Sequence, residues 1–252
     1  MPAPRNKLKA ALQEKRPQYG IWLNLASAYS AELLAGSGFD WLLIDGEHGP
    51  NSIPTILSQA QTIGDRTQVV VRPPIGEPWM IKQVLDLGVQ TLLIPMVESV
   101  EHAAELVRAM RYPPEGMRGL GASVARAADF GRTADYLTTA NRETCLLLQV
   151  ESRAGLAALP GILALDGVDG VFIGPSDLAA DMGFPGDTAV QQAIDDALLK
   201  IIARGKAAGI LTFDLALAAR YREMGVTFLG VGGDIPLLMK AAANLVSAVK
   251  GA

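Results

Sequence analysis

Eight short apolar segments constrain the fold of this 252-residue chain more than any other feature. Each is almost continuously apolar rather than alternating, which is typical of parallel strands covered on both faces. Amphipathic helical patterns fill most of the gaps, and glycines close several of them just before the next apolar segment. The predicted strands are 20–25, 41–45, 68–73, 91–97, 145–150, 170–175, 209–214 and 228–234. The predicted helices are 27–38, 78–88, 99–114, 189–209, 215–225 and 235–250.

This alternation of strands and helices predicts an α/β protein, a single (β/α)₈ TIM barrel over residues 1–252. The alternative is a doubly wound open sheet. That fold normally uses fewer strands, and no GxGxxG motif follows the first predicted strand. The absence of a linker or a low-complexity segment favours one domain.

Composition argues against several classes of function. The net charge of -4 and the lack of a clustered Lys/Arg stripe argue against nucleic-acid binding. No apolar run approaches the roughly 18 residues that span a bilayer, and the N-terminal segment has no apolar signal core. The single cysteine, Cys145, lies in an apolar run and is expected to be a buried structural thiol. These features together predict a cytoplasmic protein.

Polar side chains follow the carboxyl ends of the predicted strands, where barrel enzymes place their active sites. The amino ends carry little comparable chemistry. The polar residues, in strand order from the second strand, are Asp45, Glu47, His48, Arg72, Glu98, Gln149, Glu151, Ser176, Asp177, Asp214 and Asp234.

Two of these carboxylates indicate a metal site. Glu151 and Asp177 follow neighbouring strands and could reach one ion through oxygen ligands, which suits Mg²⁺ or Mn²⁺. The other interpretation is a pair of surface-loop acids. For three further rim acids, the favoured interpretation is a capping or first-turn position in the helix that follows, rather than a role in chemistry. These acids are Glu98, Asp214 and Asp234.

The remaining rim residues allow two interpretations each. His48 is either a general base or a surface histidine, and Asp45 either joins the chemistry or caps a loop. Arg72 either stabilises a developing oxyanion or forms a structural ion pair with a rim acid. No lysine falls in a predicted strand or at its carboxyl end, so Schiff-base catalysis is not expected. If a carbonyl is activated here, a metal ion is the remaining electrophile.

A long glycine-rich segment, 110–131, separates the fourth and fifth predicted strands. Long ordered loops in compact domains are often functional. We expect this one at the mouth of the barrel, with five of its residues near the site. They are Arg118, Gly119, Gly121, Ser123 and Arg126.

Six segments carry a resemblance to a known family: GFDWLLIDGEHGPN, VVVRPP, TLLIPMVES, RYPPEGMRGLG, LLLQVES and GVDGVFIGPSDLAADMG. They resemble the HpcH/HpaI family of metal-dependent aldolases, and the resemblance runs from about residue 7 to the C-terminus. It implies a class II enzyme of aromatic catabolism that uses Mg²⁺, Mn²⁺ or Co²⁺. Its implied reaction splits a 4-hydroxy-2-oxo acid, such as 4-hydroxy-2-oxoheptanedioate, into pyruvate and an aldehyde such as succinate semialdehyde. The reverse reaction adds pyruvate or hydroxypyruvate to an aldehyde.

The resemblance also assigns binding roles and an assembly. Glu151 and Asp177 are implied as the metal ligands, and Gln149 as a substrate contact. The backbone from Gly174 to Asp177 is implied to receive the carboxylate of the 2-oxo acid. Many relatives have alanine at Ser176, which matters little for a backbone contact. Paired trimers forming a homohexamer, with the last helix exchanged between neighbours, are also implied.

Proton transfer is assigned to a second group of residues by the same resemblance. His48 is implied as the general base and Arg72 as the residue that binds substrate and stabilises the transition state. Asp86 is implied to raise the pKa of His48, although its helical segment by itself indicates a surface charge. Asp45 and Glu47 are expected to orient His48 or a metal-bound water.

Three alternatives stay open from the sequence. One is a 2-keto-3-deoxy sugar acid aldolase of the glucarate or rhamnonate type, because the residues that select the aldehyde, such as Trp79 and Phe213, lie in variable loops. Another is a metal-independent phosphate-binding isomerase or lyase, suggested by VGGD at 231–234. The third is a non-catalytic binding barrel.

Overall fold

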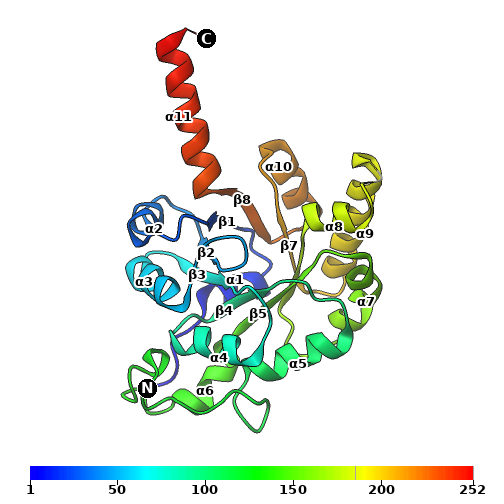
Figure 1. Ribbon diagram of the computed structural model, residues 1–252. Helices are drawn as coiled ribbons and strands as arrows, with labels where there is room; N and C mark the ends of the chain where they lie inside the picture. Colours follow the sequence, from blue (N-terminus) through cyan, green and yellow to red (C-terminus); the bar gives the residue numbers. More distant parts are fainter. Residues whose placement is uncertain (185, 252) are drawn as a thin grey trace.

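A computed structural model describes residues 1–184 and 186–251 and shows a closed barrel of eight parallel strands in sequential order, which confirms the predicted fold (Figure 1). Residue 252 of the predicted domain lies outside the described residues. The strands are β1 (Gln18–Leu23), β2 (Trp41–Asp45), β3 (Gln68–Arg72), β4 (Thr91–Ile94), β5 (Cys145–Val150), β6 (Gly170–Ile173), β7 (Ala207–Leu211) and β8 (Phe228–Gly233).

Helices surround the barrel, and α11 alone projects away from it in Figure 1. None of the described helices combines the length and apolar character needed to traverse a lipid bilayer. The helices are α1 (Lys7–Gln13), α2 (Ala28–Ala35), α3 (Ile53–Ile63), α4 (Pro78–Asp86), α5 (Val100–Met110), η1 (Arg126–Ala128), α6 (Tyr136–Glu143), α7 (Arg153–Leu163), α8 (Pro175–Asp181), α9 (Asp187–Ala203), α10 (Leu215–Met224) and α11 (Asp234–Lys250).

The interior of the barrel is filled by large aromatic side chains. Trp41 stacks on Phe228 with ring centroids 4.1 Å apart, and Trp22 meets Trp41 edge-on at 5.5 Å. Gly20 makes this packing possible, because a side chain at that position would overlap the Trp41 ring. Cys145 belongs to the same buried cluster, as the sequence predicts. The interior is therefore a packed core, and only its carboxyl end is left for chemistry.

Several element boundaries differ from those predicted. β7 begins at Ala207 rather than residue 209, so α9 ends before the small residues that the helical pattern absorbed. Five helices were not predicted: α1, α3, α6, α7 and α8. α7 contains Pro160 within the helix, which weakened its helical pattern. α3 has Pro54 in its first turn, where proline is tolerated because the N–H groups there need no intrahelical partner.

Candidate functional site

A cavity of about 350 Å³ opens at the carboxyl end of the barrel. Ten named residues were given roles in the site, and eight of them line this cavity. Glu47 contacts one of the eight, Arg72, and Asp86 does not lie at the cavity. The eight are Asp45, His48, Arg72, Gln149, Glu151, Gly174, Ser176 and Asp177.

The guanidinium of Arg72 is held by a two-point contact with Asp45. These residues end β3 and β2 and are direct neighbours in the parallel register. Nε of Arg72 donates to Oδ1 of Asp45 at 2.9 Å, and Nη2 donates to Oδ2 at 2.7 Å. The third nitrogen, Nη1, lies 2.7 Å from Oε2 of Glu47 and 3.4 Å from Oε1 of Gln149. Arg72 is thus ion-paired, as one of the two interpretations from the sequence has it, and it also lines the cavity.

Asp45 organises this side of the cavity and is fully buried. Besides Arg72, it accepts hydrogen bonds from the side-chain amide of Asn24 at 2.7 Å and the backbone N–H of Glu47 at 3.0 Å. Burial alone would raise the pKa of Asp45, but the hydrogen bonds and charge of Arg72, with these backbone donors, bring the pKa below its ordinary value. Asp45 is therefore a fixed anion that orients its neighbours.

His48 lies at the mouth of the cavity with its side chain 65% exposed. Its Nε2 lies 3.8 Å from Oε2 of Glu47, and its backbone N–H points to Oδ1 of Asp45 at 3.4 Å. The imidazole can therefore reach a molecule in the cavity while it remains open to solvent.

Glu151 is the buried acid on the opposite side of the cavity, only 2% exposed. Its Oε1 accepts the backbone N–H of Met96 at 2.9 Å, and its Oε2 accepts the side-chain amide of Gln149 at 2.5 Å. Burial raises the pKa of Glu151, and the negative charges of Glu47 and Asp177 raise it further, against those two hydrogen bonds. The ionised form therefore needs a positive partner in the cavity.

Glycine is required beside this carboxylate. A side chain at Gly174 would collide with Oε2 and Cβ of Glu151. Gly174 lies between β6 and α8, so its backbone leads directly to Ser176 and Asp177 in the first turn of α8. The absence of a side chain at Gly174 consequently lets this backbone pack directly against the carboxylate of Glu151.

The side chains at this end fit a hard divalent cation. Glu151 and Asp177 offer carboxylate oxygens across one cavity, and burial also raises the pKa of Glu47, next to both. Among the described residues no three His, Cys, Asp or Glu side chains are grouped closely enough to hold an ion alone. Two protein carboxylates, completed by water and substrate, would form the ligand set that the family resemblance implies.

Other rim acids have structural roles. Asp214 is the N-cap of α10 and accepts the backbone N–H groups of Ala216 and Leu217 at 2.8 and 3.2 Å. The capping or first-turn role expected for Glu98 is wrong, because this exposed residue precedes Ser99, the N-cap of α5. Asp234 is a first-turn residue of α11, as expected, but it is buried and bonds outside its helix.

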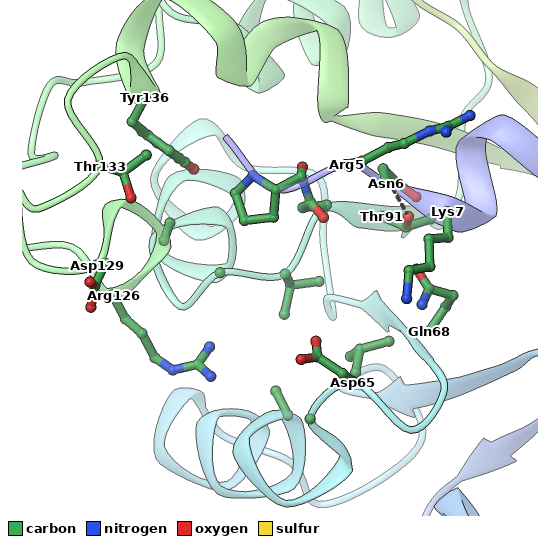
Figure 2. Close-up of a pocket in the computed structure, with 18 of the residues that line it drawn as sticks. Arg5, Asn6, Lys7, Asp65, Gln68, Thr91, Arg126, Asp129, Thr133 and Tyr136 are labelled. Carbon is green, nitrogen blue, oxygen red and sulfur yellow. Dashed lines mark hydrogen bonds between the residues drawn. The ribbon is translucent and has the colours of Figure 1, made fainter. Parts of the chain in front are cut away.

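The prediction for segment 110–131 is wrong, because this segment lies at the amino end of the barrel. It follows α5, which runs back along the barrel wall, so it starts at the end opposite the active site. Figure 2 shows Arg126 beside a cavity of about 410 Å³ that also contacts the start of β3 at Gln68 and of β4 at Thr91. Arg126 Nη1 donates to the carbonyl of Leu87 at 2.6 Å.

Asp86 also lies at the amino end of the barrel, which we call the lower end. The carboxyl end is the upper end, and the cavities at the two ends are the upper and lower cavities. It is the last residue of α4, and its Oδ1 accepts a hydrogen bond from Nη2 of Arg118 at 2.7 Å. Within one chain Asp86 and His48 therefore lie at opposite ends of the barrel. The expected effect of Asp86 on the pKa of His48 cannot arise inside a single chain, because α4 carries its C-terminus away from the rim.

One residue of the site was missed from the sequence. Asn24 lines the cavity and holds Asp45 through its side-chain amide. The signal was present, since Asn24 is a polar residue near the carboxyl end of an otherwise apolar predicted strand.

The amino-acid sequence is similar to one protein family and to several characterised aldolases. The family model for HpcH/HpaI aldolase/citrate lyase matches residues 18–241. A hydroxypyruvate/pyruvate aldolase of Roseovarius nubinhibens is 56% identical over 246 residues, covering 96% of each chain. A 4-hydroxy-2-oxo-heptane-1,7-dioate aldolase of Escherichia coli is 54% identical over 246 residues, covering 96% of this chain and 94% of that one.

Solved structures agree with these matches. The crystal structure of an HpcH/HpaI aldolase/citrate lyase family protein from Burkholderia cenocepacia superposes with a TM-score of 0.93 at 40% identity. The match covers 97% of this chain and 99% of that chain. An HpcH/HpaI aldolase from Desulfitobacterium hafniense gives a TM-score of 0.88 at 29% identity and covers 96% of each chain.

Proposed function

This chain belongs to the HpcH/HpaI aldolase/citrate lyase family, and from that premise we propose that it is a divalent-metal-dependent aldolase acting on 4-hydroxy-2-oxo acids. It cleaves the C3–C4 bond to release pyruvate and an aldehyde, and in reverse adds pyruvate or hydroxypyruvate to an aldehyde. The observation that carries the proposal is buried Glu151, crowded by two further carboxylates beside Arg72.

Glu151 and Asp177 would hold Mg²⁺, Mn²⁺ or Co²⁺. When bound, the ion supplies a Lewis acid for the 2-oxo group. None of the eight lysines, all of which are among the described residues, lies in a strand or lines the upper cavity. The chain therefore offers no amine there for a Schiff base.

Arg72 and Gln149 bind and orient the 2-oxo acid. Arg72 cannot turn away from the cavity, because Asp45 fixes two of its nitrogens. Its third nitrogen faces the amide oxygen of Gln149, whose amide nitrogen donates to Glu151, so the two side chains are held side by side at the cavity. A pre-oriented guanidinium stabilises negative charge that develops when the C–C bond breaks, at no cost of reorientation during the reaction.

His48 removes the proton of the C4 hydroxyl, directly or through water. Its imidazole lies at the cavity mouth, where the aldehyde half of the substrate would leave. Glu47 lies on the inner side of the ring and stabilises the imidazolium that forms. The proton is then free to return to the pyruvate carbon or to solvent.

The assembly proposed here is a homohexamer of paired trimers with α11 exchanged. Only Asp234 of this helix is buried, and its exposed apolar residues call for a covering surface. In such an assembly Asp86 can approach the His48 of another chain, which one chain does not permit. The exposed apolar residues are Ile235, Leu237, Leu238, Met239, Leu245, Val246 and Val249.

The structure argues against a phosphate-binding barrel. Asp234 places a buried carboxylate at the start of α11, in the VGGD segment that suggested a phosphate site. That charge would repel a phosphate group at this helix terminus. The family and its named relatives likewise favour aldol chemistry over a non-catalytic barrel.

The proposal is tested by a panel of 4-hydroxy-2-oxo acids, including 4-hydroxy-2-oxoheptanedioate and 2-keto-3-deoxy sugar acids, assayed for pyruvate. Each is measured after chelation and after addition of Mg²⁺, Mn²⁺ or Co²⁺. We expect metal-dependent pyruvate release, and aldol addition of hydroxypyruvate to a short aldehyde. Full activity after exhaustive chelation would contradict the metal-dependent reaction. The order of activity on these substrates separates a heptanedioate-type enzyme from a sugar acid aldolase.

We also propose that the protein is located in the cytoplasm.

A further inference from the structure

The first turn of α11 is joined to the upper cavity through the buried carboxylate of Asp234. This residue is only 5% exposed, although the rest of its helix projects from the barrel (Figure 1). Its Oδ1 accepts the backbone N–H of Asn24 at 2.9 Å, and its Oδ2 accepts that of Leu25 at 3.1 Å. Oδ1 also accepts the N–H of Ile235 at 2.8 Å. The carboxylate thus ties the loop after β1 to the start of α11.

The connection continues from Asn24 into the catalytic residues. The side-chain amide of Asn24 donates to Oδ2 of Asp45 at 2.7 Å. Asp45 in turn holds Nε and Nη2 of Arg72. An unbroken series of hydrogen bonds therefore runs from α11 through Asp234, Asn24 and Asp45 to Arg72. Gly233 and Pro236, on either side of Asp234, line the same cavity.

We propose that Asp234 is a positioning residue for the reaction: it fixes Asn24 and, through Asn24 and Asp45, the orientation of the Arg72 guanidinium. This inference rests on the proposed aldolase function. It also links catalysis to α11, the helix whose exposed apolar residues a second chain would cover. Seating of that helix then sets the geometry of the catalytic arginine.

Asp214 provides a matched comparison for Asp234. Both acids stand at the carboxyl end of the barrel, where a strand gives way to a helix. The carboxylate of Asp214 bonds only N–H groups of its own helix, those of Ala216 and Leu217. Asp234 bonds its own helix and a separate loop. A purely helix-capping role predicts similar behaviour for both residues, whereas a positioning role predicts a catalytic effect for Asp234 alone.

The kinetic test compares Asp234→Asn with Asp214→Asn, using pyruvate release from the best substrate of the panel. Asn keeps one acceptor oxygen but turns an amide N–H₂ toward one of the loop donors. We expect kcat of Asp234→Asn to fall about 10- to 100-fold with KM within about twofold, as for a small misplacement of a catalytic group. Asp214→Asn should keep kcat within about twofold. Equal kcat values for the two variants would overturn the proposal.

A double-variant cycle with Asn24→Ala tests the route. Asn24→Ala should lower kcat by a similar factor, because it removes the amide that holds Asp45. Adding Asp234→Asn to Asn24→Ala should then lower kcat by no more than about a further twofold. Losses that multiply would overturn the route through Asn24. Should Asp234→Asn not fold, a normal kcat in Asn24→Ala alone would overturn the proposal.

Hydrogen exchange gives a readout that does not depend on activity. The backbone amides of Asn24 and Leu25 should exchange faster in Asp234→Asn than in the wild type or Asp214→Asn. Unchanged exchange at these amides would show that the tether does not exist. If the wild type released no pyruvate, the proposed function would fail, while exchange would still test the tether by itself.

Discussion

The two ends of the barrel each contain a buried arginine paired with an aspartate, yet their surroundings differ. At the carboxyl end, Arg72 is fixed by Asp45 and faces further carboxylates across a cavity. At the amino end, Arg118 pairs with Asp86, and its guanidinium lies 4.3 Å from the ring centroid of Tyr112. Burial raises the pKa of the Tyr112 hydroxyl to about 12, so this residue stays neutral.

The difference shows what makes an ion pair functional here. The upper end has an excess of carboxylates, and burial raises the pKa values of Glu47 and Glu151. Such an excess favours the binding of a cation or of protons. The lower pair is matched one to one and covered by aromatic rings, which is an arrangement that holds a loop in place. Ligand chemistry is therefore expected at the upper end alone.

The largest effect should come from removing the buried acid at the upper end. Glu151→Gln should lower kcat/KM about a thousandfold and abolish stimulation by Mn²⁺, because a Lewis-acid metal contributes several kcal/mol to the transition state. The matched control is Asp65→Asn, an exposed acid that lines the lower cavity. It should keep its activity and metal response. Normal metal-stimulated pyruvate release by Glu151→Gln would contradict the site.

The two histidines of the chain give the next comparison. His48→Ala should lower kcat about 100-fold, at the lower end of the usual range for a general base. Mn²⁺ affinity, measured by calorimetry, should remain close to that of the wild type. His102→Gln, in the first turn of α5, is the control and should keep its kcat. If both variants retained normal kcat, His48 would not be the base.

A smaller effect is expected of metal on the thermal stability of the protein, and it should depend on pH. The raised pKa of Glu151 means that its ionisation disfavours the metal-free fold once pH rises above the ordinary value of 4.5. A divalent ion held by Glu151 would offset this cost at neutral pH, and protons would displace the ion as pH falls through the raised pKa. Metal should therefore raise Tm by several degrees at pH 7.5 and by less at pH 5.

Thermal unfolding with and without EDTA checks this dependence. In Glu151→Gln the metal-induced increase in Tm should be absent at both pH values. Asp45 behaves oppositely, because its lowered pKa adds stability that is present above its ordinary pKa of 3.8 and lost as pH falls through the lowered value. An increase in Tm that grew toward acid pH would contradict the assignment of Glu151.

The sequence predicted the barrel and most of the upper site because both follow from local pattern. A strand that ends in Asp45 or Arg72 can be read directly, and parallel pairing then brings such residues together. The errors concern the end of the barrel to which each helix leads the chain. Segment 110–131 follows a helix that returns to the amino end, so its arginines lie there. Asp86 shows the same limit, since only the fold reveals that α4 ends away from His48.

The smallest effect should come from the lower cavity, and it sharpens the comparison most directly. Arg126 Nη1 donates to the carbonyl of Leu87 just after α4. Arg126→Gln removes this contact, which is worth about 1 kcal/mol, so Tm should fall by about 2–4 °C. The kcat should stay within about twofold, since Arg126 bonds to none of the residues proposed to bind the metal or to transfer a proton. Arg5→Gln, an exposed residue of the same cavity, is the control and should leave Tm unchanged. A loss of kcat greater than tenfold in Arg126→Gln, with Tm little changed, would mean that the lower cavity takes part in catalysis, and the division between the two cavities would fail.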